Sequence, residues 1–468
     1  MKENCAVDLS HHLSRVARTL ESRPQYTAMP GVINVDGGIP DTEYFPFESI
    51  TVEYLEPTAF PIAPTDFFPH RPGVLGWIAN VLTGKTSKTT EAPTGRFVIP
   101  RRLRSDDEGK FELSNALSYS PVTGLSEAET IIREGVSQVH RPAYHNWKTL
   151  IDVGACCGWS SCLTVLLDPG DAFLTDRYAY NVALFQARAR DVTPVAVGTD
   201  DDGLSPTDLE RTIVEWDEKI RGFRRPRVIY TQGGIHNPTG QLLSTQRKKD
   251  IYDVAVRYDL IIIEDDPYFY QQAAPYTGAI TQAVVKETDE TWLERLVPSF
   301  LRFDYQGRVI RLDTFSKSIG PGGRLGYYTG APLIITKLEA LHKHFISFPS
   351  GLSQAIYGEL LHRYKTEGFT RWLRGITAQY ELRRNCVIDA LYKVLDIRST
   401  NGPSGSVTLT AYVMTDSEKS CPSAALMSFV PPRSVCMSAL LSTTHKSTGA
   451  GCSCGSRFIF ITIQTTNA

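Results

Sequence analysis

The stretch RLDTFSKSIGPGGRLGYYTG, residues 311–330, decides the fold because it begins as an apolar strand and breaks into a glycine-rich turn. Lys317 stands between small hydroxyl residues and this turn, and Arg324 follows seven residues later. A lysine amine can condense with a carbonyl group, and a tight turn with an arginine can bind a phosphate. The stretch fits a lysine that binds a phosphate-bearing aldehyde cofactor, and it also fits a solvated lysine beside an ordinary loop.

Two further segments place polar residues directly after apolar strands. EDDPYFY, residues 264–270, ends an apolar run with three carboxylates, where uncompensated charge is costly. Asp265 could face a pyridinium nitrogen and Tyr268 could reach a ring hydroxyl. GGIHNPTG, residues 233–240, places Asn237 before a proline, where it can donate a hydrogen bond from a fixed turn. Each segment alone also fits a turn or a strand cap.

The order of apolar runs predicts an α/β fold. Residues 115–330 alternate short apolar runs with helix-like segments, a pattern typical of a mainly parallel sheet between helices. Ligands bind beyond the carboxyl ends of the strands in such sheets. Residues 331–395 have helical spacing, and residues 83–110 are predicted to be an exposed insertion. We expect three parts, namely an arm with loops over 1–114, a large domain over 115–345 and a smaller domain over 346–468.

The composition indicates which kinds of molecule the protein binds. The 468 residues are 42% hydrophobic, and 49 basic residues nearly balance 51 acidic ones, so the chain has no general attraction to nucleic acids or anionic membranes. No window approaches the ~20 apolar residues of a membrane helix, and the start has no apolar signal core. We therefore expect a cytoplasmic protein with small-molecule partners. The nine scattered cysteines predict reduced thiols, and Cys452, Cys454 and His445 do not complete a metal site.

Together, these motifs resemble the fold-type I pyridoxal-phosphate-dependent aminotransferases of class I and II. The likeness is to the branch that contains aromatic amino acid, kynurenine and 2-aminoadipate aminotransferases, in which NPTG, EDDPY, DTFSK and PGGRLGY recur as a set. The segments VDGGIPDTEYFPF and ALSYSPVTGLSEAETII resemble two further segments of that branch. The resemblance extends from about residue 31 to about residue 395.

The resemblance implies a large domain with a mainly parallel sheet flanked by helices, a smaller and incomplete C-terminal domain, and a homodimer. It implies the cofactor pyridoxal 5'-phosphate and ping-pong transfer of an amino group from an aromatic or similarly large amino acid to a 2-oxo acid. Lys317 would bind the cofactor covalently and, once displaced by substrate, would carry a proton from the substrate α-carbon.

The resemblance also assigns roles to other residues of the sequence. Those at the cofactor are Asp265 at the ring nitrogen, Asn237 and Tyr268 at the ring oxygen, Thr314, Ser316 and Arg324 at the phosphate, Tyr180 near the ring, and Tyr119 reaching the phosphate bound by the partner subunit. Those at the substrate are Gly38 through its backbone, Asn237 and Arg457.

One departure from the family lies in DVGACCGWSSCLTVLLDPGD, residues 152–171. The family has GSQQGL there, with a serine and a glutamine that help to bind phosphate, and this chain has Ala155 and Cys156 instead. Backbone N–H groups at a helix start can still bind the anion, so weaker cofactor binding is expected. Cys156 is interpreted as a buried inert thiol, with a nucleophile as the alternative.

The second departure is the C-terminal segment. From residue 401 onward 21 of 68 residues are Ser or Thr, and no helical period is present. The segment is expected to be atypical or disordered, and it resembles translated non-coding or frame-shifted sequence. The family clamps the substrate carboxylate with an arginine in a late strand, for which Arg457 is the candidate here. Two alternatives stay open, namely other pyridoxal-phosphate chemistry (a β-lyase or a secondary-metabolite enzyme) and a cofactor-binding protein inactivated by its C-terminus.

Overall fold

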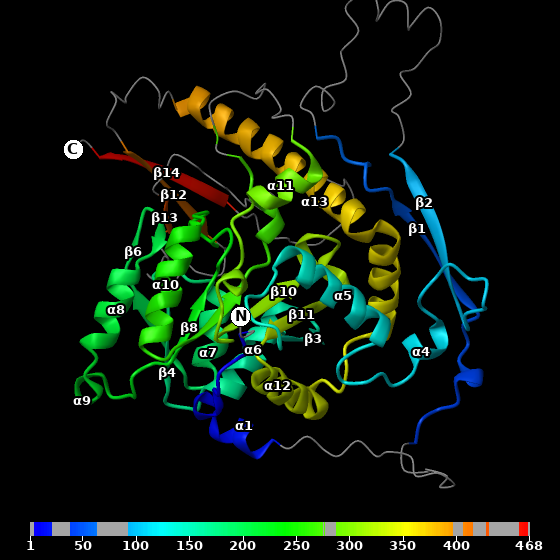
Figure 1. Cartoon of the computed structure of the whole chain (residues 1–468). Coiled ribbons are helices and arrows are strands. Elements are labelled where there is room, and N and C mark those ends of the chain that lie inside the picture. Colours follow the sequence, from blue (N-terminus) through cyan, green and yellow to red (C-terminus); the bar gives the residue numbers. More distant parts are fainter. Residues whose placement is uncertain are drawn as a thin grey trace, which may run out of the picture.

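The computed structural model describes residues 4–20, 38–62, 92–274, 276, 287–395, 406–414, 427–429 and 458–466. A seven-stranded sheet lies at its centre (Figure 1). In spatial order its strands are β3 (Lys148–Asp152), β11 (Gly326–Gly330), β10 (Val309–Thr314), β9 (Ile261–Asp265), β8 (Val228–Thr231), β4 (Ala172–Asp176) and β5 (Thr193–Val197). Only β11 runs against its neighbours within this sheet. The prediction of a mainly parallel α/β sheet is therefore confirmed.

Helices cover both faces of the sheet. One face packs against α1 (Arg15–Thr19), α6 (Ala155–Leu166), α7 (Asn181–Arg188) and α12 (Pro332–Phe345). The other packs against α4 (Leu113–Leu117), α5 (Ser126–Val139), α8 (Pro206–Val214), α10 (Thr245–Arg257) and α13 (Gly351–Leu395). In β9, Ile261 and Ile263 pack on the α6 face and Ile262 packs on the α10 face. This alternation follows from the pleat of a strand, in which successive side chains point to opposite faces of the sheet. It therefore determines on which face of the sheet the following residues lie.

Short elements complete the described chain. They are α9 (Glu218–Arg221), α11 (Asp289–Arg295), the pair β6 (Thr199–Asp200) and β7 (Gly203–Leu204), and the 3-10 turns η1 (Ser10–His12), η2 (Thr42–Tyr44), η3 (Phe269–Gln271), η4 (Phe300–Arg302), η5 (Phe315–Lys317) and η6 (Pro321–Gly323). The long α13 is interrupted at Lys365, whose φ of 52° and ψ of −175° are not helical. No helix in the described part of the chain is long and apolar enough to cross a membrane.

The N-terminal region contains more structure than the sequence predicted. β1 (Ser49–Leu55) and β2 (Thr94–Pro100) form an antiparallel pair. Phe97 and Ile99 of β2 are buried in a cluster with α4, α5 and α13, whereas Val98 between them is exposed. The prediction that residues 83–110 form an exposed insertion is therefore wrong for β2. Its seven residues alternate inward and outward, and the polar sequence on either side hid this short period.

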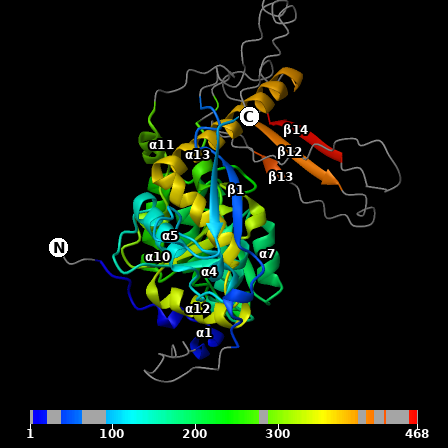
Figure 2. The same cartoon turned by 90° about the vertical axis from the view of Figure 1, so that its right-hand side faces the viewer.

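A separate sheet forms in the C-terminal segment (Figure 2). Its strands are β12 (Ser406–Met414), β13 (Met427–Phe429) and β14 (Phe458–Thr466), all paired antiparallel. Arg457, His445, Cys452 and Cys454 lie outside the described residues. The division into three parts and the atypical nature of the segment from residue 401 stay predictions.

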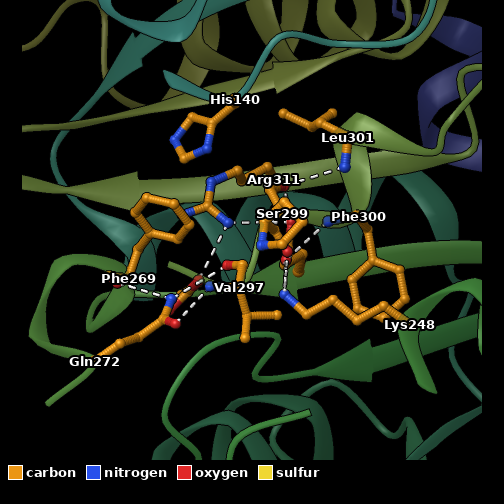
Figure 3. A network of polar contacts seen from close by, with 12 residues as sticks. His140, Lys248, Phe269, Gln272, Val297, Ser299, Phe300, Leu301 and Arg311 are labelled. Atoms are coloured by element: carbon orange, nitrogen blue, oxygen red, sulfur yellow. Dashed lines mark hydrogen bonds and ion pairs between the residues drawn. The ribbon is translucent and has the colours of Figure 1, made fainter. Parts of the chain in front are cut away.

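A buried network of charged side chains lies on the α10 face, where β9 and β10 pair (Figure 3). Arg311 is fully buried and stands directly opposite Glu264 in the strand register. Its Nη1 lies 3.1 Å from Glu264 Oε2 and 3.3 Å from Asp266 Oδ2. Its Nε lies 2.9 Å from Asp313 Oδ2. One guanidinium therefore joins carboxylates on two neighbouring strands.

Lys248 of α10 supplies the second cation of this network. Its Nζ lies 3.4 Å from Glu264 Oε1 and donates a hydrogen bond of 2.7 Å to the Pro298 carbonyl. Two cations thus face three carboxylates. Burial raises the pKa of Asp313 to about 6, while Arg311 acts in the opposite direction. The cations explain how two of the three adjacent carboxylates at the end of β9 are tolerated inside the protein.

We expect Arg311→Met to lower the free energy of unfolding by about 3–5 kcal/mol, because it leaves buried carboxylates without their main cation. Urea denaturation followed by tryptophan fluorescence measures the loss. Arg257→Met is the matched control, since Arg257 Nη1 pairs with Glu210 at 2.7 Å on the surface, where such a pair contributes about 0–1 kcal/mol. Equal losses in both variants would contradict the importance of the buried network.

Candidate active site

The candidate site lies on the α6 face, beyond the carboxyl ends of β8, β9 and β10. Asp265 is the last residue of β9, and strand alternation turns it away from Glu264 and toward α6. Tyr230 of β8 donates a 2.6 Å hydrogen bond to Asp265 Oδ2. Asp265 Oδ1 is buried and has no hydrogen-bond partner among the described residues. Burial raises the pKa of Asp265 to about 6, and the Tyr230 hydrogen bond opposes this rise.

Lys317 is held at the end of β10 by its backbone. Thr314 ends the strand, and its side chain caps η5 by accepting a hydrogen bond from Ser316 N at 3.2 Å. Gln271 Nε2 donates a 2.9 Å hydrogen bond to the Lys317 carbonyl. The half-buried Lys317 side chain extends to Tyr268, with Nζ 5.7 Å from the centre of the ring. The amine is therefore free to react while its backbone stays in place.

Hydrogen-bond donors gather between η6 and the N-terminus of α6. Thr314 Oγ1 and Ser316 Oγ lie 2.9 Å apart, and Arg324 Nη1 lies 3.5 Å from Ser316 Oγ. Gly154 precedes α6 with a φ of +119°, and a Cβ on it would lie 2.9 Å from Arg324 Nη2. Glycine at this position thus allows the helix N-terminus, which begins at Ala155, to approach the guanidinium. Two hydroxyls, a guanidinium and helical N–H groups are a suitable set of donors for a phosphate.

Other predicted residues close the site around the same space. Asn237 lies beside the Tyr268 hydroxyl, whose pKa is raised by burial and by the charge of Asp265 and lowered by Asn237. Tyr180 lies beside the Cys156 thiol, and each group affects the pKa of the other. Partial desolvation by the surrounding protein raises the pKa of that thiol, and the charge of Asp265 raises it further. The interactions of Cys156 therefore place the start of α6 beside the end of β9.

Cys156 differs from the sequence prediction. The interpretation as a buried inert thiol is wrong with respect to burial, because the side chain is exposed. As the second residue of α6 it faces the open carboxyl edge of the sheet, whereas Cys162, two turns later, is buried in the core. Arg324 and Lys317 both lower the pKa of Cys156, so their charges act on it from the same space.

Two predicted residues show no contact with this site within a single chain, and a third lies outside the described residues. Tyr119 is 63% exposed and its ring contacts Phe348 edge-on at 5.6 Å. Gly38 is exposed, and an added Cβ there would meet no atom within 4 Å. Arg457 lies outside the described residues. The predicted substrate side of the site is therefore untested.

The sequence prediction missed Tyr230, which holds Asp265. The available signal was a tyrosine inside the apolar strand VIYT, residues 228–231, because a buried phenol needs a partner for its hydroxyl. The partner of this hydroxyl could not be predicted from the sequence, because 35 residues separate Tyr230 from Asp265 in the chain.

The residues present fit pyridoxal phosphate. The buried, unpartnered Asp265 Oδ1 can accept a hydrogen bond from a ring N–H group. The donors around Arg324 suit a phosphate, and the Lys317 amine suits an aldehyde. The parallel sheet and this donor set define an enzyme that holds a phosphate-bearing pyridine aldehyde on a lysine.

Comparison with known proteins gives the family. Residues 98–421 match the model of class I and II aminotransferases, and the chain belongs to this family. It is 33% identical to an aromatic amino acid aminotransferase of Schizosaccharomyces pombe over 396 residues, 83% of this chain and 76% of the relative. It is also 33% identical to an L-tyrosine:2-oxoglutarate aminotransferase of Tapinella panuoides over 392 residues, 82% of this chain and 69% of the relative.

A solved structure has the same fold. The crystal structure of an aminotransferase from Candida albicans has a TM-score of 0.73 and 30% sequence identity, covering 88% of this chain and 82% of that chain. The resemblance to the fold-type I aminotransferases and their aromatic branch is therefore confirmed. The protein is a pyridoxal-phosphate-dependent transaminase.

We expect iodoacetamide to alkylate Cys156 in the cofactor-free protein and pyridoxal phosphate to protect it, because the thiol lies among the residues that fit the cofactor. At ten times the Kd of the cofactor, labelling should slow about tenfold, in proportion to the cofactor-free fraction. Fragment-ion mass spectrometry separates this adduct from one on the adjacent Cys157, whose pKa burial raises to about 12.

Cys5, which is exposed and lies beside His145, is the internal control and should be labelled at one rate in both samples. Equal labelling of Cys156 with and without cofactor would show that the thiol does not line the cofactor site.

Proposed function

We propose that this aminotransferase takes an aromatic or similarly large amino acid as donor and a 2-oxo acid as acceptor, in a ping-pong exchange. One observation supports locating the reaction at these residues. The unpartnered Asp265 Oδ1 lies on the same side of the sheet as Lys317 and the donors around Arg324. The substrate class is supported by the relatives that are named as aromatic amino acid and tyrosine aminotransferases. The β-lyase and inactive-protein alternatives have no supporting observation.

Pyridoxal phosphate, when bound, supplies a ring that withdraws electrons from the substrate α-carbon. In this proposal Asp265 Oδ1 accepts a hydrogen bond from the ring nitrogen, and the ionised carboxylate favours the protonated ring. Asn237 and Tyr268, which lie beside one another, would hold the ring oxygen. The side chain of Tyr180 packs near the ring.

The phosphate would be bound by Arg324, Ser316, Thr314 and the backbone N–H groups at the start of α6. Ala155 and Cys156 contribute only main-chain donors there, because neither side chain replaces the serine or glutamine of the family. This arrangement supports the expectation of weaker cofactor binding.

Lys317 has two roles in the proposal. It binds the cofactor covalently between reaction cycles, and it takes the proton from the substrate α-carbon once substrate has displaced it. The hydrogen bond from the Gln271 side chain to the Lys317 carbonyl keeps the turn after β10 in place during both roles. Only the four-carbon side chain has to move.

The substrate side is proposed from the resemblance alone. Gly38 would contact substrate through its backbone, and Arg457 would clamp the substrate carboxylate. Tyr119, exposed in the single chain, would reach the phosphate bound by the partner subunit, which requires a homodimer. We also propose a cytoplasmic location, since the nearly balanced charge of the chain gives it no attraction to anionic membranes.

Adding pyridoxal phosphate to the purified protein should produce a visible absorption band that requires Lys317, and adding phenylalanine should remove it. Lys317→Ala should abolish the band, because it removes the amine that lies on the same side of the sheet as Asp265 and Arg324. Lys219→Ala, an exposed residue of α9, is the control and should behave as the wild type.

Product analysis completes this test. Formation of the matching 2-oxo acid supports transamination of an aromatic donor. Release of ammonia or thiol would favour the lyase alternative, and a band that ignores all amino acids would favour the inactive protein.

Subunit mixing tests the proposed role of Tyr119. Tyr119→Ala and Lys317→Ala subunits, each nearly inactive, should regain about one quarter of wild-type activity when co-expressed, because half of the dimers are mixed and each mixed dimer holds one intact site. Differently tagged subunits allow the mixed dimer to be purified and assayed.

Mixing Lys317→Ala with Asp265→Ala subunits is the matched control. Both residues belong to one chain's site, so no intact site forms in that mixture. Absence of recovery in the Tyr119 mixture as well would place Tyr119 outside the site of the partner subunit.

A further inference from the structure

The residue that holds Asp265 is Tyr230, a fully buried tyrosine of β8. In the strand register Tyr230 stands opposite Ile263 of β9, so Asp265 is its diagonal neighbour on the same face of the sheet. Its hydroxyl donates a hydrogen bond of 2.6 Å to Asp265 Oδ2. The bond leaves Oδ1 as the only oxygen of this carboxylate without a hydrogen-bond partner among the described residues.

An aromatic cluster fixes the ring of Tyr230. Its centroid lies 4.5 Å from that of Trp159 and 6.5 Å from that of Phe173. Trp159 is itself held in α6, where Nε1 donates a 3.0 Å hydrogen bond to the Ala183 carbonyl of α7. The hydroxyl of Tyr230 therefore cannot turn away from Asp265 without repacking two helices.

A second buried tyrosine–aspartate pair shows what is unusual about the first. Tyr252 of α10 donates a 2.8 Å hydrogen bond to Asp304 Oδ1. Backbone N–H groups of Arg308 and Val309 donate to Oδ1 and Oδ2 of the same carboxylate. Asp304 is thus fully satisfied within the protein, whereas Asp265 keeps one oxygen for another molecule.

We propose that Tyr230 is a positioning residue for cofactor binding, whose hydroxyl occupies Asp265 Oδ2 and so directs Oδ1 toward the ring nitrogen of pyridoxal phosphate. This inference rests on the proposed role of Asp265. A carboxylate held by one oxygen from the side of β8 cannot rotate the other oxygen away from the site. The hydroxyl also stabilises the ionised form, since the Tyr230 hydrogen bond lowers the pKa that burial raises.

Tyr230→Phe tests the inference because it removes one oxygen and keeps the aromatic packing. The Kd for pyridoxal phosphate should rise about tenfold, the effect of losing one hydrogen bond to a charged group. The Kd is measured by absorbance titration of protein from which the cofactor has been dialysed. Asp265→Ala should raise the Kd more strongly, by about a hundredfold relative to the wild type.

The double variant separates a positioning role from a structural one. If Tyr230 acts through Asp265, adding Tyr230→Phe to Asp265→Ala should change the Kd by less than about twofold. A tenfold change in both backgrounds would overturn the inference, because it would show that Tyr230 affects the site by another route. An unchanged Kd in Tyr230→Phe alone would also overturn it.

Tyr252→Phe is the matched control. It removes the hydroxyl of an equally buried tyrosine from a buried aspartate on the other face of the sheet, so it should lower Tm as Tyr230→Phe does and leave the Kd unchanged. A rise in Kd for both variants would overturn the inference by showing a general loss of stability. An unchanged Kd in Asp265→Ala would instead reject the proposed role of Asp265.

Discussion

The pairing of Arg311 with carboxylates on β9 and β10 is the constraint on which the site depends. Both strands carry site residues at their carboxyl ends, Asp265 on β9 and the Thr314 to Lys317 turn on β10. A guanidinium that contacts Glu264 and Asp266 on one strand and Asp313 on the other tolerates no shift in register. A one-residue shift would also move every side chain to the opposite face of the sheet. The ion pairs on the α10 face thus set the geometry of the site on the α6 face.

Strand alternation divides the three adjacent acidic residues between two environments. Glu264 and Asp266 meet cations, and the lower pKa of Glu264 shows that Arg311 and Lys248 outweigh the burial that raises it. Asp265 forms no ion pair with the described residues and accepts a hydrogen bond from a phenol hydroxyl on one oxygen. Burial raises the pKa of Asp265 to about 6, and its second oxygen has no hydrogen-bond partner among the described residues. A protonated ring nitrogen could supply the missing donor to this buried acceptor.

The sequence predicted the local features of the fold and site more completely than the contacts between distant segments. The lysine turn, the strand ends with Asn237 and Asp265, and the mainly parallel sheet were readable because each depends on neighbouring residues. The partners of Arg311 and the Tyr230–Asp265 bond were not, since they depend on strand order and register. β2 was missed because polar sequence surrounds its short alternating run, and Cys156 was misjudged because exposure at a helix start depends on what the helix faces.

The start of α6 shows how the site can lack two side chains of its family and keep its chemistry. A helix N-terminus presents main-chain N–H groups whatever its side chains are. What it requires is close approach to the other donors, and here Gly154 provides that approach, because a Cβ would press on Arg324. Arg324 in turn has a left-handed backbone conformation, with a φ of 46°, and donates a hydrogen bond from Nη1 to the Pro321 carbonyl at 3.1 Å. The proposed phosphate site therefore depends on backbone geometry at two positions, so a side chain at Gly154 would disturb it more than the exchange of serine and glutamine for Ala155 and Cys156.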